Sequence, residues 1–396
     1  MPTTNTYSDP HNLFSVPDIT PEKYGDKFSG HGDIPVYLPA HYSHFDAHEL
    51  IAVASALVNP RGRGIYATDE APLDLDGLLD KTSHEVGVPV QHLSDEAKKE
   101  RRKQWRCDVY NSISNEHISG IILHAESLHD FNLGPLLSSK GIIPGIRANG
   151  ELTPIPRAEH EFIVQGLDGL LGKLQAARAL GARFSKWRAP IACSSHIAGY
   201  PTSISLQIQA ETLAQFAAVS QQAGLVPIVE PDVDFSRDAD LSKSVHVHEA
   251  AISMIYERMK AHGVLLEGTL LKPSFPQPGL RNNERPNVTA EEIALATATM
   301  LTRCVPIAVA GVLFLSGGLS SDTATSYLSA LNELVASAPE RSALKRLPPL
   351  TFSFGRAIQG DALKCWVKGD KDGMKTMLAK WSKISADAAN GPKVKN

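Results

Sequence analysis

Eight short apolar runs alternate with longer segments of helical pattern along most of this chain, and this alternation constrains the fold more than any other feature. Short runs bounded by Gly or Pro are typical of buried strands, whereas longer segments with apolar residues every three or four positions are typical of amphipathic helices. The runs span residues 63–69, 118–124, 141–147, 183–188, 225–230, 265–272, 311–316 and 350–354. Helical segments include residues 49–58, 203–222, 245–262, 289–303, 321–335 and 357–367.

Strands that alternate with helices form parallel βαβ units, and eight such units close into a barrel. The length of 396 residues suits one such barrel. A dinucleotide-binding fold is disfavoured, because no Gly-rich phosphate motif follows the first strand. We therefore predict the α/β class and a (β/α)8 TIM barrel in a single domain. Residues 1–45 would form a partly ordered N-terminal arm, residues 46–370 the barrel, and residues 371–396 a C-terminal helix and tail.

Charge and hydropathy exclude several classes of protein. The net charge is -4 and no long cluster of Lys and Arg occurs, so we expect no nucleic-acid partner. The longest apolar run, 305–315, is about half of the ~20 residues that a membrane span requires, so we expect no membrane association. The first residues lack the pattern of a secretory signal, and the four cysteines are isolated, which favours a cytoplasmic location.

Polar or charged residues close most of the predicted strands. In barrel enzymes the chemistry lies at the C-terminal ends of the strands, so these residues would share one mouth. Charged residues at strand ends are often merely solvated, but complementary charges on nearly every strand favour a site. The closing residues are Asp69 and Glu70, Arg147, Lys186 and Arg188, Glu230, Lys272, Ser316 to Gly318, and Gly355 with Arg356.

Among these residues, Lys272 is the one that a purely structural role explains least well. A lysine at the end of an apolar strand is costly to bury, and burial beside a second cation would lower its pKa, as a Schiff-base nucleophile requires. Lys186 and Arg188 share one face of their strand, and either could supply that cation. Glu230 and Asp69 could serve as acid and base with pKa values pushed apart. A purely structural Lys–Glu network is the alternative interpretation.

Seven segments together resemble the class I, Schiff-base fructose-bisphosphate aldolases, from about residue 49 to about residue 385. The resemblance implies a (β/α)8 barrel, usually a homotetramer, that cleaves a ketose bisphosphate reversibly into dihydroxyacetone phosphate and an aldehyde. It also implies a sugar-phosphate substrate, no metal and no cofactor. In chain order the segments are GIYATDE at 64–70, VQGLDGL at 164–170, FSKWR at 184–188, VPIVEP at 226–231, LEGTLLKP at 266–273, FLSGG at 314–318 and FSFGRA at 352–357.

The resemblance also implies roles for individual residues. Lys272 would be the nucleophile, and Glu230 would be the acid and base for forming and dehydrating the carbinolamine. Asp69 would accept the hydroxyl proton when the C3–C4 bond breaks, while Lys186 and Arg188 would position the substrate. The residues that would hold the 1-phosphate of the dihydroxyacetone half are Ser316, Gly317, Gly355 and Arg356.

The chain departs from the family pattern at the part of the site expected to hold the 6-phosphate. Family members follow Asp-Glu with a Ser-Thr-Gly type turn, whereas this chain has Ala71 and Pro72, followed by Asp74, Asp76 and Asp80, which would add negative charge there. Arg147 replaces a family lysine and could still hold a phosphate. The family's C-terminal tyrosine is also missing, which predicts altered proton exchange at the enamine.

Several interpretations remain open at this stage. The chain could be a fructose-bisphosphate aldolase in which Arg147 compensates, an aldolase that joins dihydroxyacetone phosphate to a different, possibly unphosphorylated aldehyde, or a non-catalytic sugar-phosphate binder or scaffold. A homo-oligomer, tetramer or dimer, is expected. The histidines at 41, 44 and 48 have helical spacing, but they precede the first strand, so we expect no metal site there. For His124 and His129, near the end of the second strand, the sequence favours a core or solvated role.

Overall fold

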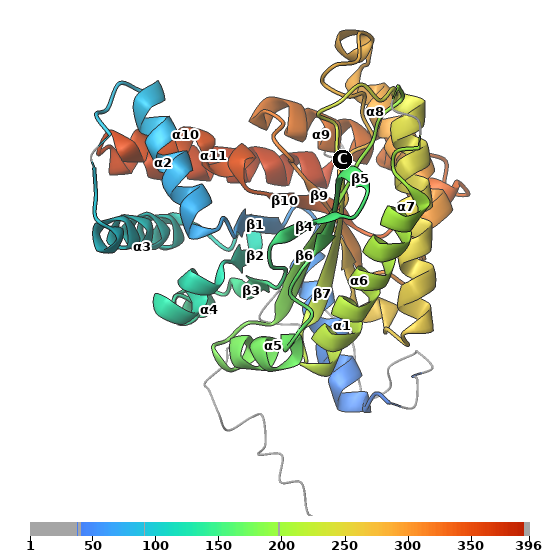
Figure 1. Cartoon of the computed structure of the whole chain (residues 1–396), viewed down its shortest axis with the longest axis horizontal. Coiled ribbons are helices and arrows are strands. Elements are labelled where there is room, and N and C mark those ends of the chain that lie inside the picture. Colours follow the sequence, from blue (N-terminus) through green and yellow to red (C-terminus); the bar gives the residue numbers. More distant parts are fainter. Residues whose placement is uncertain (1–37, 39–40, 91, 197–198, 392–396) are drawn as a thin grey trace, which may run out of the picture.

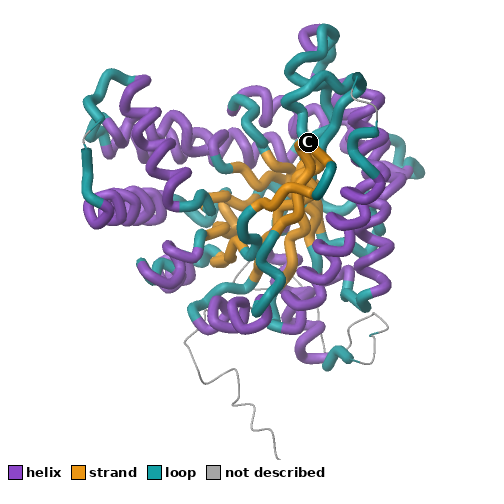
Figure 2. Tube along the Cα trace, in the orientation of Figure 1, coloured by secondary structure: helices purple, strands orange, loops and turns teal. Residues whose placement is uncertain are grey.

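The computed structural model describes residue 38 and residues 41–90, 92–196 and 199–391. Its centre is a closed barrel of parallel strands surrounded by helices (Figures 1 and 2), which confirms the predicted TIM barrel. Most of the predicted arm, residues 1–45, and the end of the predicted tail lie outside the described residues. The division of the chain at residues 45 and 370 therefore stays a prediction.

All eight strand positions predicted from the sequence contribute to the barrel. Each strand is parallel to both of its neighbours, and the order around the barrel is β1, β10, β9, β8, β7, β6, β3, β2. The strands are β1 (Gly64–Thr68), β2 (Ile118–Leu123), β3 (Ile143–Arg147), β6 (Phe184–Ile191), β7 (Val226–Val233), β8 (Leu270–Leu271), β9 (Gly311–Leu315) and β10 (Leu350–Phe354).

Helices follow the strands and form the outer layer of the molecule (Figure 2). The last helix packs against the two before it, with Met374, Leu378 and Trp381 on its buried side, as its apolar spacing predicts. The helices are α1 (His44–Val58), α2 (Pro72–Glu85), α3 (Asp95–Ser112), α4 (Gly134–Ser139), α5 (Leu170–Ala179), α6 (Ser203–Gln222), α7 (Leu241–Ala261), α8 (Ala290–Cys304), α9 (Ser321–Ser337), α10 (Arg356–Val367) and α11 (Lys371–Asn390).

Several features differ from the sequence prediction. Strands β6 and β7 continue to Ile191 and Val233, past the predicted ends at 188 and 230. The run at 265–272 provides only a two-residue strand, because Leu266–Gly268 forms a 3₁₀ turn, η3, just before β8. An antiparallel hairpin of β4 (Leu152–Ile155) and β5 (Ala158–Val164), which we did not predict, lies outside the barrel order. Residues 152–154 are exposed, so this strand lacks the apolar pattern of the barrel strands.

Helix α1 closes the N-terminal end of the barrel. Its residues form one apolar cluster with Ile65, Phe184 and Leu313 from the strands, and the Leu57 carbonyl accepts a 2.6 Å hydrogen bond from Ser119. With this end closed, the C-terminal ends of the strands form the face available for a site. None of the described helices is long and apolar enough to cross a membrane.

Candidate active site

Four charged side chains from four barrel strands meet in one buried cluster: Asp69 and Lys272 directly follow β1 and β8, whereas Lys186 and Glu230 lie within β6 and β7. The Nζ atom of Lys186 lies 2.7 Å from Oδ2 of Asp69 and 3.2 Å from Oε2 of Glu230. The Nζ atom of Lys272 lies 3.3 Å from the same Glu230 oxygen. Side chains of both lysines and of Glu230 are almost completely buried. The cluster therefore joins β1, β6, β7 and β8, which confirms that these residues share one mouth.

Burial and charge act differently on the two lysines. Burial lowers the pKa of Lys272; Glu230 opposes this shift, and the positive charge of Lys186 adds to it. Lys186 faces both Asp69 and Glu230, and these two carboxylates raise its pKa despite its burial. Lys186 thus stays charged while Lys272 is the lysine more easily deprotonated, which is the difference that an amine nucleophile needs.

The surroundings of the two carboxylates lower the pKa of each below its usual value. That their pKa values are pushed apart stays a prediction. Burial opposes ionisation at both, and the charges of Lys186 and Lys272 outweigh it. Both groups are therefore held as carboxylates, because they share the same two lysines.

Lys186, and not Arg188, supplies the second cation beside Lys272. Arg188 points to Asp232, with Nε 2.7 Å from Oδ2, and its side chain is 45% exposed. Asp232 on β7 was not singled out in the sequence, although it lies two residues after Glu230 and so on the same face of the strand. Arg188 is thus held at the rim of the cluster.

A buried network supports the turn that carries Asp69. The neighbouring residue, Glu70, accepts a 2.8 Å bond from Arg106 of α3 and another hydrogen bond from Gln359 of α10. Gln359 in turn accepts a 2.7 Å bond from the hydroxyl of Tyr66 on β1. Arg106 and Gln359 lie within helices that are distant in sequence, so no local pattern could have indicated them.

A hollow of about 420 Å³ lies at the ends of β9 and β10. Gly317 and Gly318 follow β9 with φ angles of 50° and 94°, which only glycine adopts readily, and Gly355 forms the N-cap of α10. The hollow lies between the first turns of α9 and α10, where backbone N–H groups favour an anion. Of the residues predicted to hold the 1-phosphate, Gly317 and Arg356 line this hollow, whereas Ser316 and Gly355 precede lining residues in the sequence and do not line it themselves. The other lining residues include Gly318, Ser320, Thr323, Arg285 and one carboxylate, Asp234.

The segment after Asp69 adds less negative charge to the mouth of the barrel than the sequence suggests. Pro72 begins α2, which carries all three aspartates. Asp76 lies 2.7 Å from Arg102 and Asp80 lies 2.8 Å from Arg101, so α3 compensates both charges. Asp74 is exposed in the first turn of α2. Arg147, at the end of β3, donates a 3.3 Å bond to the Asp69 carbonyl.

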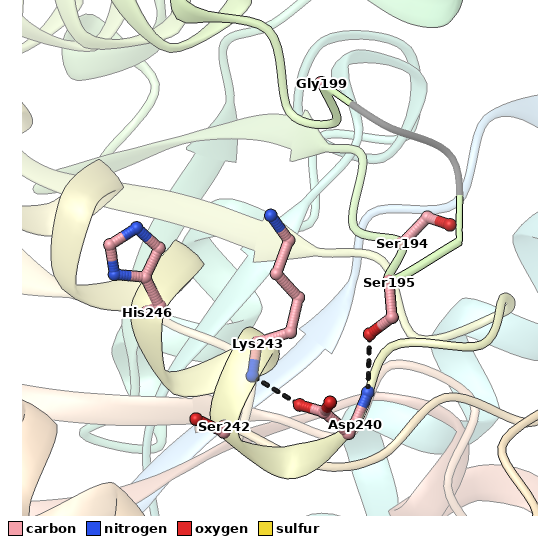
Figure 3. Close-up of a pocket in the computed structure, with 7 residues that line it drawn as sticks. All are labelled: Ser194, Ser195, Gly199, Asp240, Ser242, Lys243 and His246. Atoms are coloured by element: carbon pink, nitrogen blue, oxygen red, sulfur yellow. Dashed lines mark hydrogen bonds between the residues drawn. The ribbon is translucent and has the colours of Figure 1, made fainter.

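A second hollow, of about 430 Å³, lies beside the start of α7 (Figure 3). Asp240 caps this helix by accepting from the Lys243 N–H, and its own N–H donates to Ser195. None of the predicted site residues lines this hollow. The residues around it are Ser194, Ser195, Gly199, Asp240, Ser242, Lys243 and His246.

His248 of α7 fixes the segment that follows Lys272. Its ring is 1% exposed and lies with Nδ1 2.7 Å from the Ser244 carbonyl and Nε2 2.9 Å from the Ser274 hydroxyl. The Ser274 oxygen also accepts a 3.0 Å bond from the N–H of Val233 on β7. These bonds suit a neutral ring that donates through Nδ1 and accepts through Nε2.

Because His248 is buried, we expect the free energy of unfolding to fall in acid. Burial lowers the pKa of His248 from 6.5 to about 4, so between these pH values the unfolded chain binds a proton that the folded chain does not. The free energy of unfolding is expected to fall by about 2 kcal/mol more from pH 7 to pH 5 in the wild type than in His248→Asn. Urea denaturation at both pH values measures this. Equal pH dependence in the two proteins would contradict it.

Comparison with known proteins identifies the family. The family model described as fructose-bisphosphate aldolase class-I matches residues 49–395. The chain belongs to the class-I fructose-bisphosphate aldolase family. It is 36% identical to a fructose-bisphosphate aldolase of Schistosoma mansoni, over 87% of this chain and 90% of that protein. It is 35% identical to fructose-bisphosphate aldolase B of Oryctolagus cuniculus, with the same coverage.

A solved structure agrees with the aldolase assignment. The fructose-bisphosphate aldolase of Plasmodium falciparum, crystallised with TRAP and a small-molecule inhibitor, has a TM-score of 0.79 and 31% identity to this chain. The match covers 91% of this chain and 99% of the Plasmodium chain. The chain is thus a class I aldolase, a lyase of a family that acts on sugar phosphates, and no comparison favours the scaffold or altered-acceptor alternatives.

Proposed function

We propose that this enzyme cleaves fructose 1,6-bisphosphate reversibly into dihydroxyacetone phosphate and glyceraldehyde 3-phosphate through a Schiff base on Lys272. The observation that carries the proposal is the buried Lys272 amine, 3.3 Å from a Glu230 oxygen that also contacts the charged Lys186. Such a site offers an amine of lowered pKa beside a group able to transfer protons.

The position of each residue in the cluster suits it to one step of the reaction. The neutral Lys272 amine attacks the C2 carbonyl, and Glu230 carries the protons that convert the carbinolamine to a protonated imine and water. Asp69 accepts the proton of the C4 hydroxyl, the C3–C4 bond breaks, and its electrons pass to the imine to give an enamine while the aldehyde leaves. Protonation and hydrolysis then release dihydroxyacetone phosphate and the free lysine. Lys186 stabilises negative charge near the C4 oxygen, and Arg188 positions the substrate.

The hollow at the ends of β9 and β10 suits the 1-phosphate of the dihydroxyacetone half. Backbone N–H groups at Gly317 and Gly355, the Ser316 hydroxyl and the Arg356 guanidinium would act together on the dianion. The anion site is supported by the glycine turn after β9 and by the hollow's two arginines. Arg147 would assist the 6-phosphate at the end of β3.

Replacing Arg356 by methionine is expected to lower kcat/KM about 10- to 100-fold, because one charge-assisted contact to the phosphate is lost. The loss should be similar for fructose 1,6-bisphosphate and fructose 1-phosphate, since both carry the 1-phosphate. Initial rates in a coupled assay for dihydroxyacetone phosphate measure this. The exposed Arg341 provides the control, because Arg341→Met should change neither value. A loss confined to the bisphosphate would contradict the assignment.

We base the proposed assembly and location of the enzyme on the family to which it belongs. We infer a homo-oligomer, a tetramer or a dimer, that works in the cytoplasm in glycolysis and gluconeogenesis. A relative 37% identical to this chain is named as a cytosolic aldolase of Arabidopsis thaliana, and the matching family model carries the name Glycolytic.

The overall proposal is tested by cleavage of fructose 1,6-bisphosphate in the presence of EDTA. We expect dihydroxyacetone phosphate and glyceraldehyde 3-phosphate in equal amounts, at a rate that EDTA does not change. Absence of cleavage, or a rate that EDTA abolishes, would overturn it.

A further inference from the structure

We propose that His124, at the end of β2, binds the phosphate of the aldehyde half of the substrate together with Arg147. The proposal rests on the proposed function and names a specificity-determining residue that none of the recognised motifs contains. The sequence favoured a core or solvated role for His124, whereas the structure places it at the mouth of the barrel.

The strand register places His124 between Asp69 and Arg147. Leu123 on β2 pairs with Thr68 of β1 on one side and with Ile146 of β3 on the other. Asp69, His124 and Arg147 are the next residues along these three strands. The half-buried His124 ring is near enough to Arg147 and Asp69 for both charges to influence its pKa. Substrate held at Asp69 is thus next to His124.

The hydrogen bond at Nδ1 determines what His124 can offer a ligand. The N–H of Glu126 donates a 3.2 Å bond to Nδ1, so a neutral ring must carry its proton on Nε2. Burial and the charge of Arg147 lower the pKa of His124, although Asp69 and Glu126 oppose them, which keeps the ring neutral at pH 7. No described residue forms a hydrogen bond with Nε2. His124 therefore presents an N–H donor.

Arg147 is the second group that would bind the phosphate beside His124. Other arginines at this end of the barrel pair with carboxylates: Arg102 with Asp76 and Glu126, Arg106 with Glu70, and Arg188 with Asp232. Among the described residues, Arg147 has no carboxylate within 4.0 Å, and its guanidinium donates a hydrogen bond only to the Asp69 carbonyl. A half-buried guanidinium with no carboxylate in direct contact, beside a neutral N–H donor, is suited to an anionic oxygen.

The position of this pair suits the second phosphate of a bisphosphate. In the barrel, β10, β1 and β2 separate β9 from β3 on one side, and β8, β7 and β6 separate them on the other. The glycine turn after β9 and Arg147 at the end of β3 therefore lie on opposite sides of the mouth. The cluster around Lys272 lies between these strands, so a substrate with its ketone at Lys272 could extend one phosphate toward each side.

Three substitutions of His124 test the proposal. His124→Ala and His124→Asn remove the donor at the Nε2 position and are expected to lower kcat/KM for fructose 1,6-bisphosphate about tenfold. His124→Gln places an amide N–H near that position and should lose less than about threefold. For fructose 1-phosphate, which lacks the second phosphate, all three variants should stay within about twofold of wild type.

Two further comparisons make the outcome decisive. His129, exposed on the segment after β2, provides the matched control, and His129→Ala should change neither value. In an Arg147→Met background, His124→Ala should cost less than in the wild type, because the two residues share one ligand. Equal losses for both substrates, or no loss for the bisphosphate, would overturn the proposal. If the wild type cleaved neither substrate, the proposed function itself would fail instead.

Discussion

Replacing Lys272 by methionine is expected to lower kcat for cleavage of fructose 1,6-bisphosphate by at least about 10³-fold, because the covalent route through the imine is lost. Methionine fills much of the space of the lysine stem and suits a side chain that is almost completely buried at the end of β8. Removing its amine also removes one of the two cations near Glu230, so the pKa of Glu230 should rise.

The matched control for this variant is Lys173→Met. Lys173 is exposed on α5, away from the strand ends, and its loss should leave kcat and KM unchanged. Lys272→Met should still bind the product dihydroxyacetone phosphate through the hollow at β9 and β10, and equilibrium binding of that product shows whether the variant is folded. A folded variant that retains cleavage within tenfold of wild type would contradict the assignment of Lys272.

Replacing Glu230 by glutamine is expected to lower kcat by about 10²- to 10⁴-fold, the range of a general acid–base catalyst. Glutamine keeps the shape but cannot transfer the protons needed to form and dehydrate the carbinolamine. The variant should also show a second, independent effect, on the pKa of Lys272. Glu230 opposes the lowering of the Lys272 pKa, so its neutralisation should lower that pKa further.

The pH dependence of imine formation measures this second effect. In Glu230→Gln, the neutral amine should form at lower pH than in the wild type, so the acid limb of the rate profile should move toward lower pH. Glu211→Gln on α6 is the control, since its carboxylate pairs with Arg258 and His262 away from the cluster. An unchanged acid limb, or a limb displaced toward higher pH, would show that Glu230 does not stabilise the charged lysine.

The barrel could be predicted because each of its strands carries a local signal. Runs such as 118–124 and 350–354 are mainly apolar and contain no Asp, Glu, Lys or Arg, and the strands that they form are buried throughout, so composition and periodicity suffice to place them. The hairpin of β4 and β5 escaped prediction because residues 152–154 of β4 are exposed and lack the apolar pattern of a barrel strand. The strand at 265–272 was predicted too long because a 3₁₀ turn, Leu266–Gly268, takes up part of the run.

The candidate site could be predicted only as a set of strand ends. The barrel fold implies that these residues share one mouth, but it does not indicate which charged side chains pair with one another there. Whether Lys186 or Arg188 lies beside Lys272 depends on which carboxylate each one meets, and Asp232 decides that for Arg188. The pairing of Asp76 with Arg102 likewise depends on how α2 packs against α3. Such contacts between distant segments have no local sequence signal.

The central claim is that Lys272 forms the covalent bond to the substrate. The most direct measurement is to incubate the enzyme with dihydroxyacetone phosphate and EDTA, reduce the mixture with borohydride, and locate the adduct by mass spectrometry of the digested chain. Reduction of an imine leaves a stable secondary amine on the lysine that formed it. We predict one adduct per chain, on Lys272, with loss of activity in proportion to labelling. An adduct on Lys186 or another lysine, or none at all, would contradict the account.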